Sequence, residues 1–171
     1  STPVHVPTKL RLAWQTPPRE TIEPTAPVTE AGVTLVAGSD GAVRAFDSSN
    51  GKYRWTAYTG GAITYPPTIA DGRVHVGSGD GRAWCFELAT GRTLWCFRAA
   101  PLERRSPVYG RLLSTWPVAS GVMVADGVAY AAAGIICHDG THVYALDAAS
   151  GRLLWFFQPQ GRSGDNTFAN L

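Results

Sequence analysis

The segment AFDSSNGKYRW, residues 45–55, has the pattern of a strand, a tight turn and a second strand. It recurs as CFELATGRTLW at 85–95 and as ALDAASGRLLW at 145–155. In every copy an acid stands eight residues before a tryptophan, and a glycine stands four residues after the acid. Self-similarity of this kind is typical of repeat architectures, in which each repeat is one supersecondary unit. The sequence therefore predicts a protein built from at least three related modules.

Two further turn signals precede each copy of the motif. Asp-Gly between apolar runs is a strong hairpin signal, because glycine adopts positive φ without strain. The turn dipeptides are Ala31-Gly32, Asp40-Gly41, Asp71-Gly72, Asp80-Gly81, Asp126-Gly127 and Asp139-Gly140. Three hairpin turns imply four antiparallel strands in each module. We expect the strands near 27–30, 33–38, 42–47 and 52–58, near 66–70, 73–78, 82–87 and 92–98, and near 120–125, 128–134, 142–147 and 152–157.

Four-stranded modules of about 40 residues arranged radially are the blades of a β-propeller. The spacing of Trp14, Trp55 and Trp95 agrees, at 41 and 40 residues, whereas Trp155 follows only after 60. The predicted fold is all-β, a partial β-propeller of three four-stranded antiparallel blades plus one strand of a preceding blade. The expected divisions of residues 1–171 are an orphan outer strand at 10–15, blades at 27–58, 66–98 and 120–157, an insertion loop at 99–120 and a tail at 158–171.

Three blades and one strand do not close a ring, since propellers carry four to eight blades. An open ring leaves sheet faces and docking surfaces exposed, which favours association. We therefore expect that the chain is a fragment, that another propeller chain completes the ring, or that further copies of the chain do so.

Composition excludes several classes of partner. The chain has 15 basic and 13 acidic residues and a net charge of +2, which is too weak to indicate nucleic acid binding. No run of about 18 apolar residues is present, so no membrane span is expected. No signal peptide is visible after Ser1, which a mature exported protein would also lack.

The motif resembles the tryptophan-docking motif of the pyrroloquinoline quinone (PQQ) propeller repeat family. Residues 45–55 and 145–155 match almost fully, while 85–95 departs from the family pattern at Cys85 and Glu87. The resemblance covers roughly residues 10–158 and implies that each tryptophan stacks near the motif glycine of the next blade. The structural docking residues that it implies are Trp14, Trp55, Trp95, Trp155, Gly51, Gly91, Gly151, Asp47, Glu87 and Asp147.

The insertion at 99–120 is the candidate binding loop, because long loops in compact repeat folds are often functional. Its candidate residues are Arg104, Arg105, Tyr109, Arg111 and Trp116, which would suit an anion or a carbohydrate over the propeller face. The alternative is a packed insertion whose arginines are simply solvated.

Three other groups of residues have the chemistry of possible sites. Cys137, His138 and His142 could hold zinc or copper, although no fourth ligand stands nearby. Cys85 and Cys96 either form a disulfide or remain two free thiols. The motif acids recur in every module at the same offset, so we assign them to the turns and assign no catalytic residue.

Active quinone dehydrogenases of the resembled family hold PQQ over a tryptophan with calcium or a lanthanide ion. Their Glu, Asn and Asp set cannot be placed on this chain, so no cofactor is expected in it. The predicted function is a non-enzymatic interaction or scaffold module of an exported bacterial protein, periplasmic or extracellular, with a protein or small-molecule ligand at the propeller face. The alternative is a fragment or subunit of a PQQ-dependent alcohol or sugar dehydrogenase, which would carry PQQ with calcium or a lanthanide.

Overall fold

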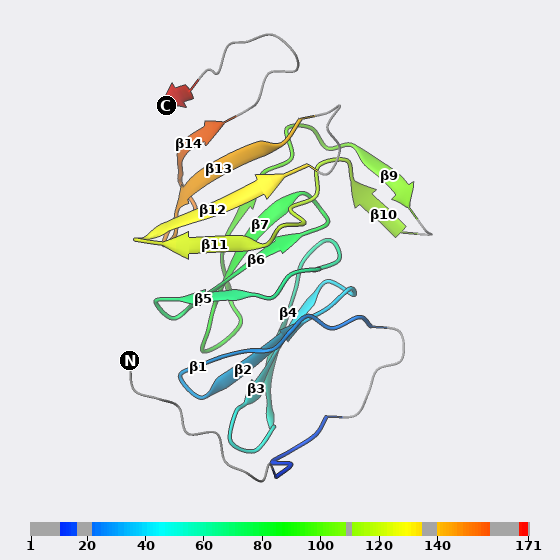
Figure 1. Ribbon diagram of the computed structural model, residues 1–171, viewed down its shortest axis with the longest axis vertical. Helices are drawn as coiled ribbons and strands as arrows, with labels where there is room; N and C mark the ends of the chain where they lie inside the picture. The colour runs from blue at the N-terminus through cyan, green and yellow to red at the C-terminus, as the bar shows by residue number, and fades with distance from the viewer. Residues whose placement is uncertain (1–10, 17–21, 109–110, 135–139, 158–167, 171) are drawn as a thin grey trace.

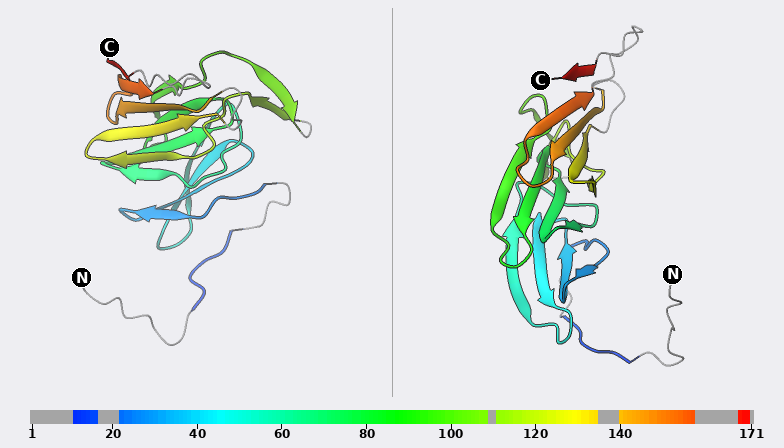
Figure 2. Two further views of the ribbon diagram at one scale, coloured as in Figure 1. Left: turned by 45° about the horizontal axis from the view of Figure 1, so that its top comes forward. Right: turned by 90° about the vertical axis from the view of Figure 1, so that its left-hand side faces the viewer.

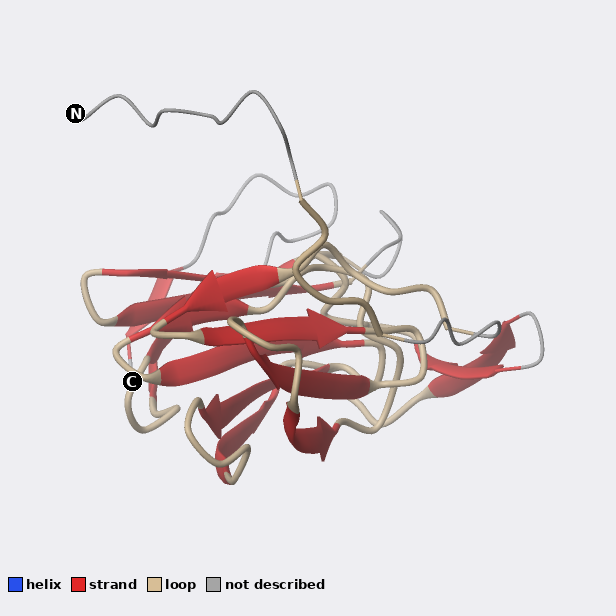
Figure 3. Cartoon of the chain, turned by 90° about the horizontal axis from the view of Figure 1, so that it is seen from below, coloured by secondary structure: helices blue, strands red, loops and turns tan. Residues whose placement is uncertain are grey.

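The computed structural model describes residues 11–16, 22–108, 111–134, 140–157 and 168–170, and all regular secondary structure among them is antiparallel strand (Figures 1 and 3). The strands form successive sheets that lie side by side along the molecule, as blades do (Figures 1 and 2). The prediction of an all-β, partial β-propeller is confirmed.

The strands of each module pair in chain order. The first module contains β1 (Val28–Glu30), β2 (Val33–Ala37), β3 (Ala42–Asp47) and β4 (Tyr53–Tyr58). The second contains β5 (Thr68–Ala70), β6 (Arg73–Ser78), β7 (Arg82–Glu87) and β8 (Thr93–Arg98). The third contains β11 (Val122–Ala125), β12 (Val128–Ala133), β13 (His142–Asp147), β14 (Leu153–Phe157) and β15 (Phe168–Asn170).

Three segments differ from the expectation. Residues 11–16 form no strand, since no described segment pairs with their backbone. The insertion expected as a loop contains a separate hairpin of β9 (Arg105–Val108) and β10 (Arg111–Ser114). The tail adds β15 to the edge of β14, which makes the third sheet five-stranded.

The conformation of the first turn in each module explains why glycine stands at its second position. Ala31, Asp71 and Asp126 have φ of 47°, 49° and 50°, and the glycine that follows each of them is also at positive φ. Two successive positive φ values define the type I′ turn, whose twist matches that of the flanking strands. Glycine carries the second position without strain.

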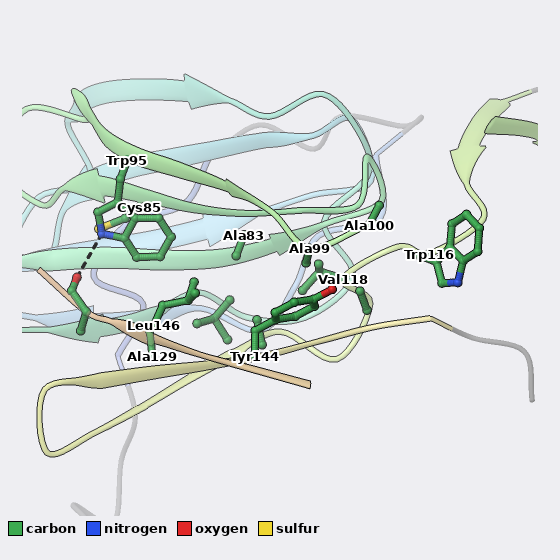
Figure 4. Close-up of a cluster of buried hydrophobic side chains, with 14 residues drawn as sticks. Ala83, Cys85, Trp95, Ala99, Ala100, Trp116, Val118, Ala129, Tyr144 and Leu146 are labelled. Atoms are coloured by element: carbon green, nitrogen blue, oxygen red, sulfur yellow. Dashed lines mark hydrogen bonds between the residues drawn. The ribbon is translucent and has the colours of Figure 1, made fainter. Parts of the chain in front are cut away.

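Alternate residues of a strand point to opposite faces of its sheet, so the second module packs on both of its neighbours. Leu35, Val43 and Ala45 of the first module pack with Val76 and Phe86 of the second in one core cluster. A second cluster joins Ala83 and Cys85 of the second module to Ala129, Tyr144 and Leu146 of the third (Figure 4). Burial of each such large apolar side chain contributes about 1.5–3 kcal/mol, so the cores lie between modules and stabilise their side-by-side arrangement.

Candidate functional site

The motif tryptophans lie at the contacts between modules. The Trp55 indole lies over Gly91, where a Cβ would stand 2.5 Å from the ring, and its Nε1 donates to the Leu88 carbonyl oxygen at 3.0 Å. Trp95 has the same relation to Gly151 and donates to the Ala148 carbonyl oxygen at 3.1 Å (Figure 4).

Trp14 makes the same contact with the first module, although its own segment is not a strand. A Cβ at Gly51 would stand 2.7 Å from the Trp14 ring, and Trp14 Nε1 donates to the Ser48 carbonyl oxygen at 2.9 Å. Three tryptophans therefore use one geometry: the ring covers a glycine at positive φ, and the indole N–H reaches the carbonyl three residues before that glycine.

Trp155 stands at the far end of the described structure. Its side chain is 36% exposed, against 7% for Trp55 and 8% for Trp95. Its ring lies 6.2 Å from that of Tyr130, and within the described segments it covers none of the motif glycines. The third module thus carries a motif tryptophan that packs on no motif glycine in the described segments.

The opposite end of the structure is hollowed. A space of about 830 Å³ lies against the first module, lined by Gln15, Ile22, Val36, Phe46 and Tyr53 among others. These residues come from the outer face of β2 to β4 and from the two segments that precede β1. Both ends of the row of modules are therefore open. At the first module Trp14 already lies on the motif glycine Gly51, whereas at the third module Trp155 lies on no motif glycine of the described segments.

The motif acids bind the turns that follow them. Asp47 accepts a hydrogen bond from Ser49 N–H at 3.0 Å, and Asp147 accepts one from Ser150 N–H at 2.8 Å. Arg54 donates to the Asp47 carboxylate at 2.7 Å and holds the pKa of that carboxyl well below its usual range. The Thr90 hydroxyl donates to Glu87 and lowers its pKa.

The candidate binding-loop residues differ in their exposure to solvent. Arg104 and Arg105 are exposed, whereas Trp116 is 7% exposed and packs in the core between the second and third modules. Tyr109 lies outside the described residues, and Arg111 lies in β10 with its side chain outside the description.

The structure brings two further arginines to this loop, which the sequence did not single out. Arg82 and Arg98 stand directly opposite each other on β7 and β8. Arg82 donates to Glu103 of the insertion at 2.9 Å. The two residues of this ion pair are 21 positions apart, so neither the motif spacing nor the repeat could reveal it.

The candidate metal ligands are not brought together in the part of the chain that is described. Cys137 and His138 lie outside the described residues, and His142 is buried with its ring stacked on Tyr144. Among described side chains, no group of three or more His, Cys, Asp or Glu residues is placed to hold a metal ion.

The two cysteines of the second module are free thiols on opposite faces of the sheet. Cys85 pairs with Trp95 across β7 and β8, and Cys96 pairs with Trp84, so the two sulfur atoms point away from each other. Burial raises the pKa of the Cys85 thiol to about 12. The register therefore excludes the disulfide alternative.

His75 is a buried residue that sequence reasoning missed. Its Nε2 lies 3.2 Å from the Ala148 carbonyl oxygen, which also accepts from Trp95. A carbonyl only accepts, so Nε2 carries the proton. Burial lowers the pKa of this imidazole. His75 stands third after the turn glycine, where the first module has Leu35, so only an alignment of modules would have revealed it.

Comparison with known proteins agrees with this geometry. The family model described as outer membrane protein assembly factor BamB, a PQQ-repeat model, matches residues 10–110. The chain belongs to this family. The BamB of Yersinia pestis is 31% identical over 153 residues, which are 85% of this chain and 36% of that protein. The BamB of Bordetella pertussis is 28% identical over 74% of this chain and 29% of its own length. The chain therefore spans about a third of the length of these curated BamB relatives.

Solved structures share the fold of this BamB-family chain. The quinohemoprotein alcohol dehydrogenase of Comamonas testosteroni has a TM-score of 0.68 and 20% identity, covering 85% of this chain and 22% of the enzyme. A europium-containing methanol dehydrogenase has a TM-score of 0.65 and 16% identity, covering 88% of this chain and 27% of the enzyme. At such identities the likeness shows the fold alone. Within the described segments, none of the secondary structure is a helix suited to crossing a membrane.

Proposed function

We propose that this chain is part of a larger exported propeller that acts as a non-enzymatic interaction scaffold in the periplasm. Further propeller repeats, in the same chain or in another, complete the ring, and a protein partner contacts the propeller face beside the insertion at 99–120. The relatives described as outer membrane protein assembly factors support this proposal. We propose that the partner belongs to the machinery that assembles outer membrane proteins.

The observation that carries the proposal is the β9–β10 hairpin. It projects from the row of sheets, and no counterpart of it stands between the first and second modules (Figures 1 and 2). Thr115 N–H donates to the Arg104 carbonyl oxygen and closes the base of the hairpin, and Ser114 N–H donates to the Gly79 carbonyl oxygen and fixes that base to the second module. Binding residues are disproportionately found on segments that depart from the rigid scaffold, which favours this hairpin over the repeated strands as the contact surface.

The proposal excludes a catalytic role for the recurring residues. Asp47, Glu87 and Asp147 are all occupied by turn hydrogen bonds, and each belongs to the repeat. The likeness to quinoprotein dehydrogenases concerns the fold at 16–21% identity, and it supports no enzymatic proposal for this chain.

The test is made in the native bacterium with the full-length protein. Residues 105–114 are replaced by a short Gly-Ser turn, and the control exchanges two exposed residues on the other side, Lys52→Gln and Arg92→Gln. We expect that the hairpin variant loses cross-linking to its protein partner and that the folded fraction of outer membrane β-barrel proteins falls, with the control unchanged. A hairpin variant that has the wild-type melting temperature and still supports both readouts would overturn the proposal.

A further inference from the structure

Two arginines of the second module face each other at positions where the repeated strand pairing does not require arginine. Arg82 and Arg98 are direct cross-strand partners on β7 and β8. Like charges directly opposite each other destabilise a sheet. The same positions of the first module hold Ala42 and Tyr58, which carry no charge. The repeat therefore does not require the arginine pair, and the ion pair with Glu103 balances the charge of Arg82 alone, leaving that of Arg98.

The insertion brings two more arginines to the same place. Arg82, Arg98, Arg104 and Arg105 line one small surface cavity, together with Asp80, Glu103 and Ser114. The cavity has a volume of about 10 Å³, which is room for roughly one oxygen atom of a ligand. Arg98, Arg104 and Arg105 are exposed, and within the described residues none of the three forms an ion pair.

The charge at this cavity is unbalanced. Four arginines and two carboxylates leave a net charge of +2. Both carboxylates are already engaged: Glu103 pairs with Arg82, and Asp80 accepts hydrogen bonds from Gly60 N–H, Arg82 N–H and Trp84 Nε1–H. A phosphate group carries about −1.5 to −2 at neutral pH and would balance this charge, whereas a single carboxylate would leave half of it.

We propose that Arg82, Arg98, Arg104 and Arg105 form a binding site for a phosphate group. One phosphate oxygen enters the cavity beside Ser114, and the arginines donate to the others, since the guanidinium fork matches phosphate geometry. This site deepens the proposed function. It rests on that function only for the identity of the molecule that presents the phosphate group. A free phosphate or phosphorylated solute and the headgroup of an anionic phospholipid share this chemistry.

The test uses the whole chain and inorganic phosphate, with sodium chloride at equal ionic strength as the reference. The variant is Arg98→Gln, and the control is Arg92→Gln, which removes the same charge from an exposed arginine at the motif turn of the same module. We expect phosphate to raise the melting temperature of the wild type and of the control by about 3–6 °C at ten times the dissociation constant. Arg98→Gln should lose at least about tenfold in affinity.

The unliganded melting temperature separates a binding site from a structural one. Because Arg98→Gln removes a like-charge contact, its melting temperature without phosphate should rise by about 1–3 °C while its phosphate affinity falls. A structural role would instead lower it. A decrease in melting temperature, or unchanged phosphate affinity, would overturn the proposal.

A second arm identifies the source of the phosphate. Wild-type chain is sedimented with neutral phosphatidylcholine vesicles and with vesicles containing 30% phosphatidylglycerol, again beside Arg98→Gln. Binding of free phosphate assigns a soluble ligand, and binding only to the anionic vesicles, lost in the variant, assigns a lipid headgroup. Binding of neither overturns the site but leaves the scaffold proposal standing, because cross-linking and barrel assembly are measured separately.

Discussion

At the scale of single residues, the contact between a tryptophan and a glycine decides how modules join. Trp14, Trp55 and Trp95 cover Gly51, Gly91 and Gly151, in each case with an indole hydrogen bond to the neighbouring turn. Glycine is required there twice over, because φ is positive and because the ring occupies the space of a Cβ.

The two requirements can be separated with Gly91→Ala and Gly72→Ala. Both glycines have positive φ, of 74° and 69°, but nothing lies within 4 Å of a Cβ at Gly72. Both variants should lose the backbone preference, and Gly91→Ala should lose about 1–3 kcal/mol more through overpacking against Trp55. Urea unfolding measures the difference, and equal losses would contradict the packing role.

His75 makes stability depend on pH. Its pKa is lowered by burial in the folded protein, from an ordinary value of 6.5. The unfolded chain therefore binds more protons below about pH 6.5, and the free energy of unfolding should fall as pH drops through that range, by at most about 1.4 kcal/mol per pH unit. Asp71 and Arg73 are the charged residues that act on His75, and they oppose each other.

The control is His75→Leu, which places in the second module the residue that the first has at Leu35. Chemical denaturation at pH 7.5 and 5.5 should show a smaller loss of stability on acidification for this variant than for the wild type. An identical pH profile in both would rule out His75 as the titrating group.

At the scale of elements, strand register fixes which side chains can meet. A bulge between Cys85 and Phe86 shifts the pairing of β7 with β8 by one residue, so Cys85 faces Trp95 and Cys96 lies on the other side of the sheet. Counting residues around the turn had left a disulfide open, because a bulge cannot be seen in the spacing alone.

The thiols should therefore differ in reactivity. Burial raises the pKa of both thiols, that of Cys85 to about 12, but only Cys96 is exposed. Iodoacetamide at pH 8 should therefore modify Cys96 in the native chain and Cys85 only after unfolding. Peptide mapping by mass spectrometry checks this order. A peptide pair cross-linked through Cys85 and Cys96 would contradict the register.

The sequence predicted the hairpins whose turns carry Asp-Gly, because those dipeptides determine the local backbone. It did not predict β9 and β10, which are joined at Tyr109-Gly110 without an Asp or Asn before the glycine. The cluster around Arg82 and Glu103 was also missed, since it depends on how the insertion folds back on the second module. Turns determined by local residue types could be predicted from the sequence, whereas contacts between segments far apart in the chain could not.

At the scale of the whole molecule, the described structure is a row of modules with two unlike ends. Each module contacts only its neighbours, so stability is approximately a sum of modules and interfaces. Trp155 is uncovered at one end, while at the other Trp14 already covers Gly51. A second copy therefore cannot dock its Trp155 on this chain without displacing Trp14.

Trp14→Ala should release this block. The variant exposes Gly51 to Trp155 of another copy, and such a head-to-tail contact that does not close gives open-ended assembly. Sedimentation at increasing concentration should show growing mass for Trp14→Ala and a constant mass for the double variant Trp14→Ala/Trp155→Ala. A single variant that keeps the mass of the double variant at all concentrations would contradict this account.

The order of tryptophan and glycine along the chain also matters while the protein is being made. Each indole is synthesised before the glycine on which it packs, with Trp55 preceding Gly91 by 36 residues and Trp95 preceding Gly151 by 56. At roughly 5–20 residues per second, about 2 to 11 seconds pass between the synthesis of an indole and that of its glycine. A nascent chain of such modules thus exposes the indole of its most recent motif tryptophan at its growing end, however many modules it has completed.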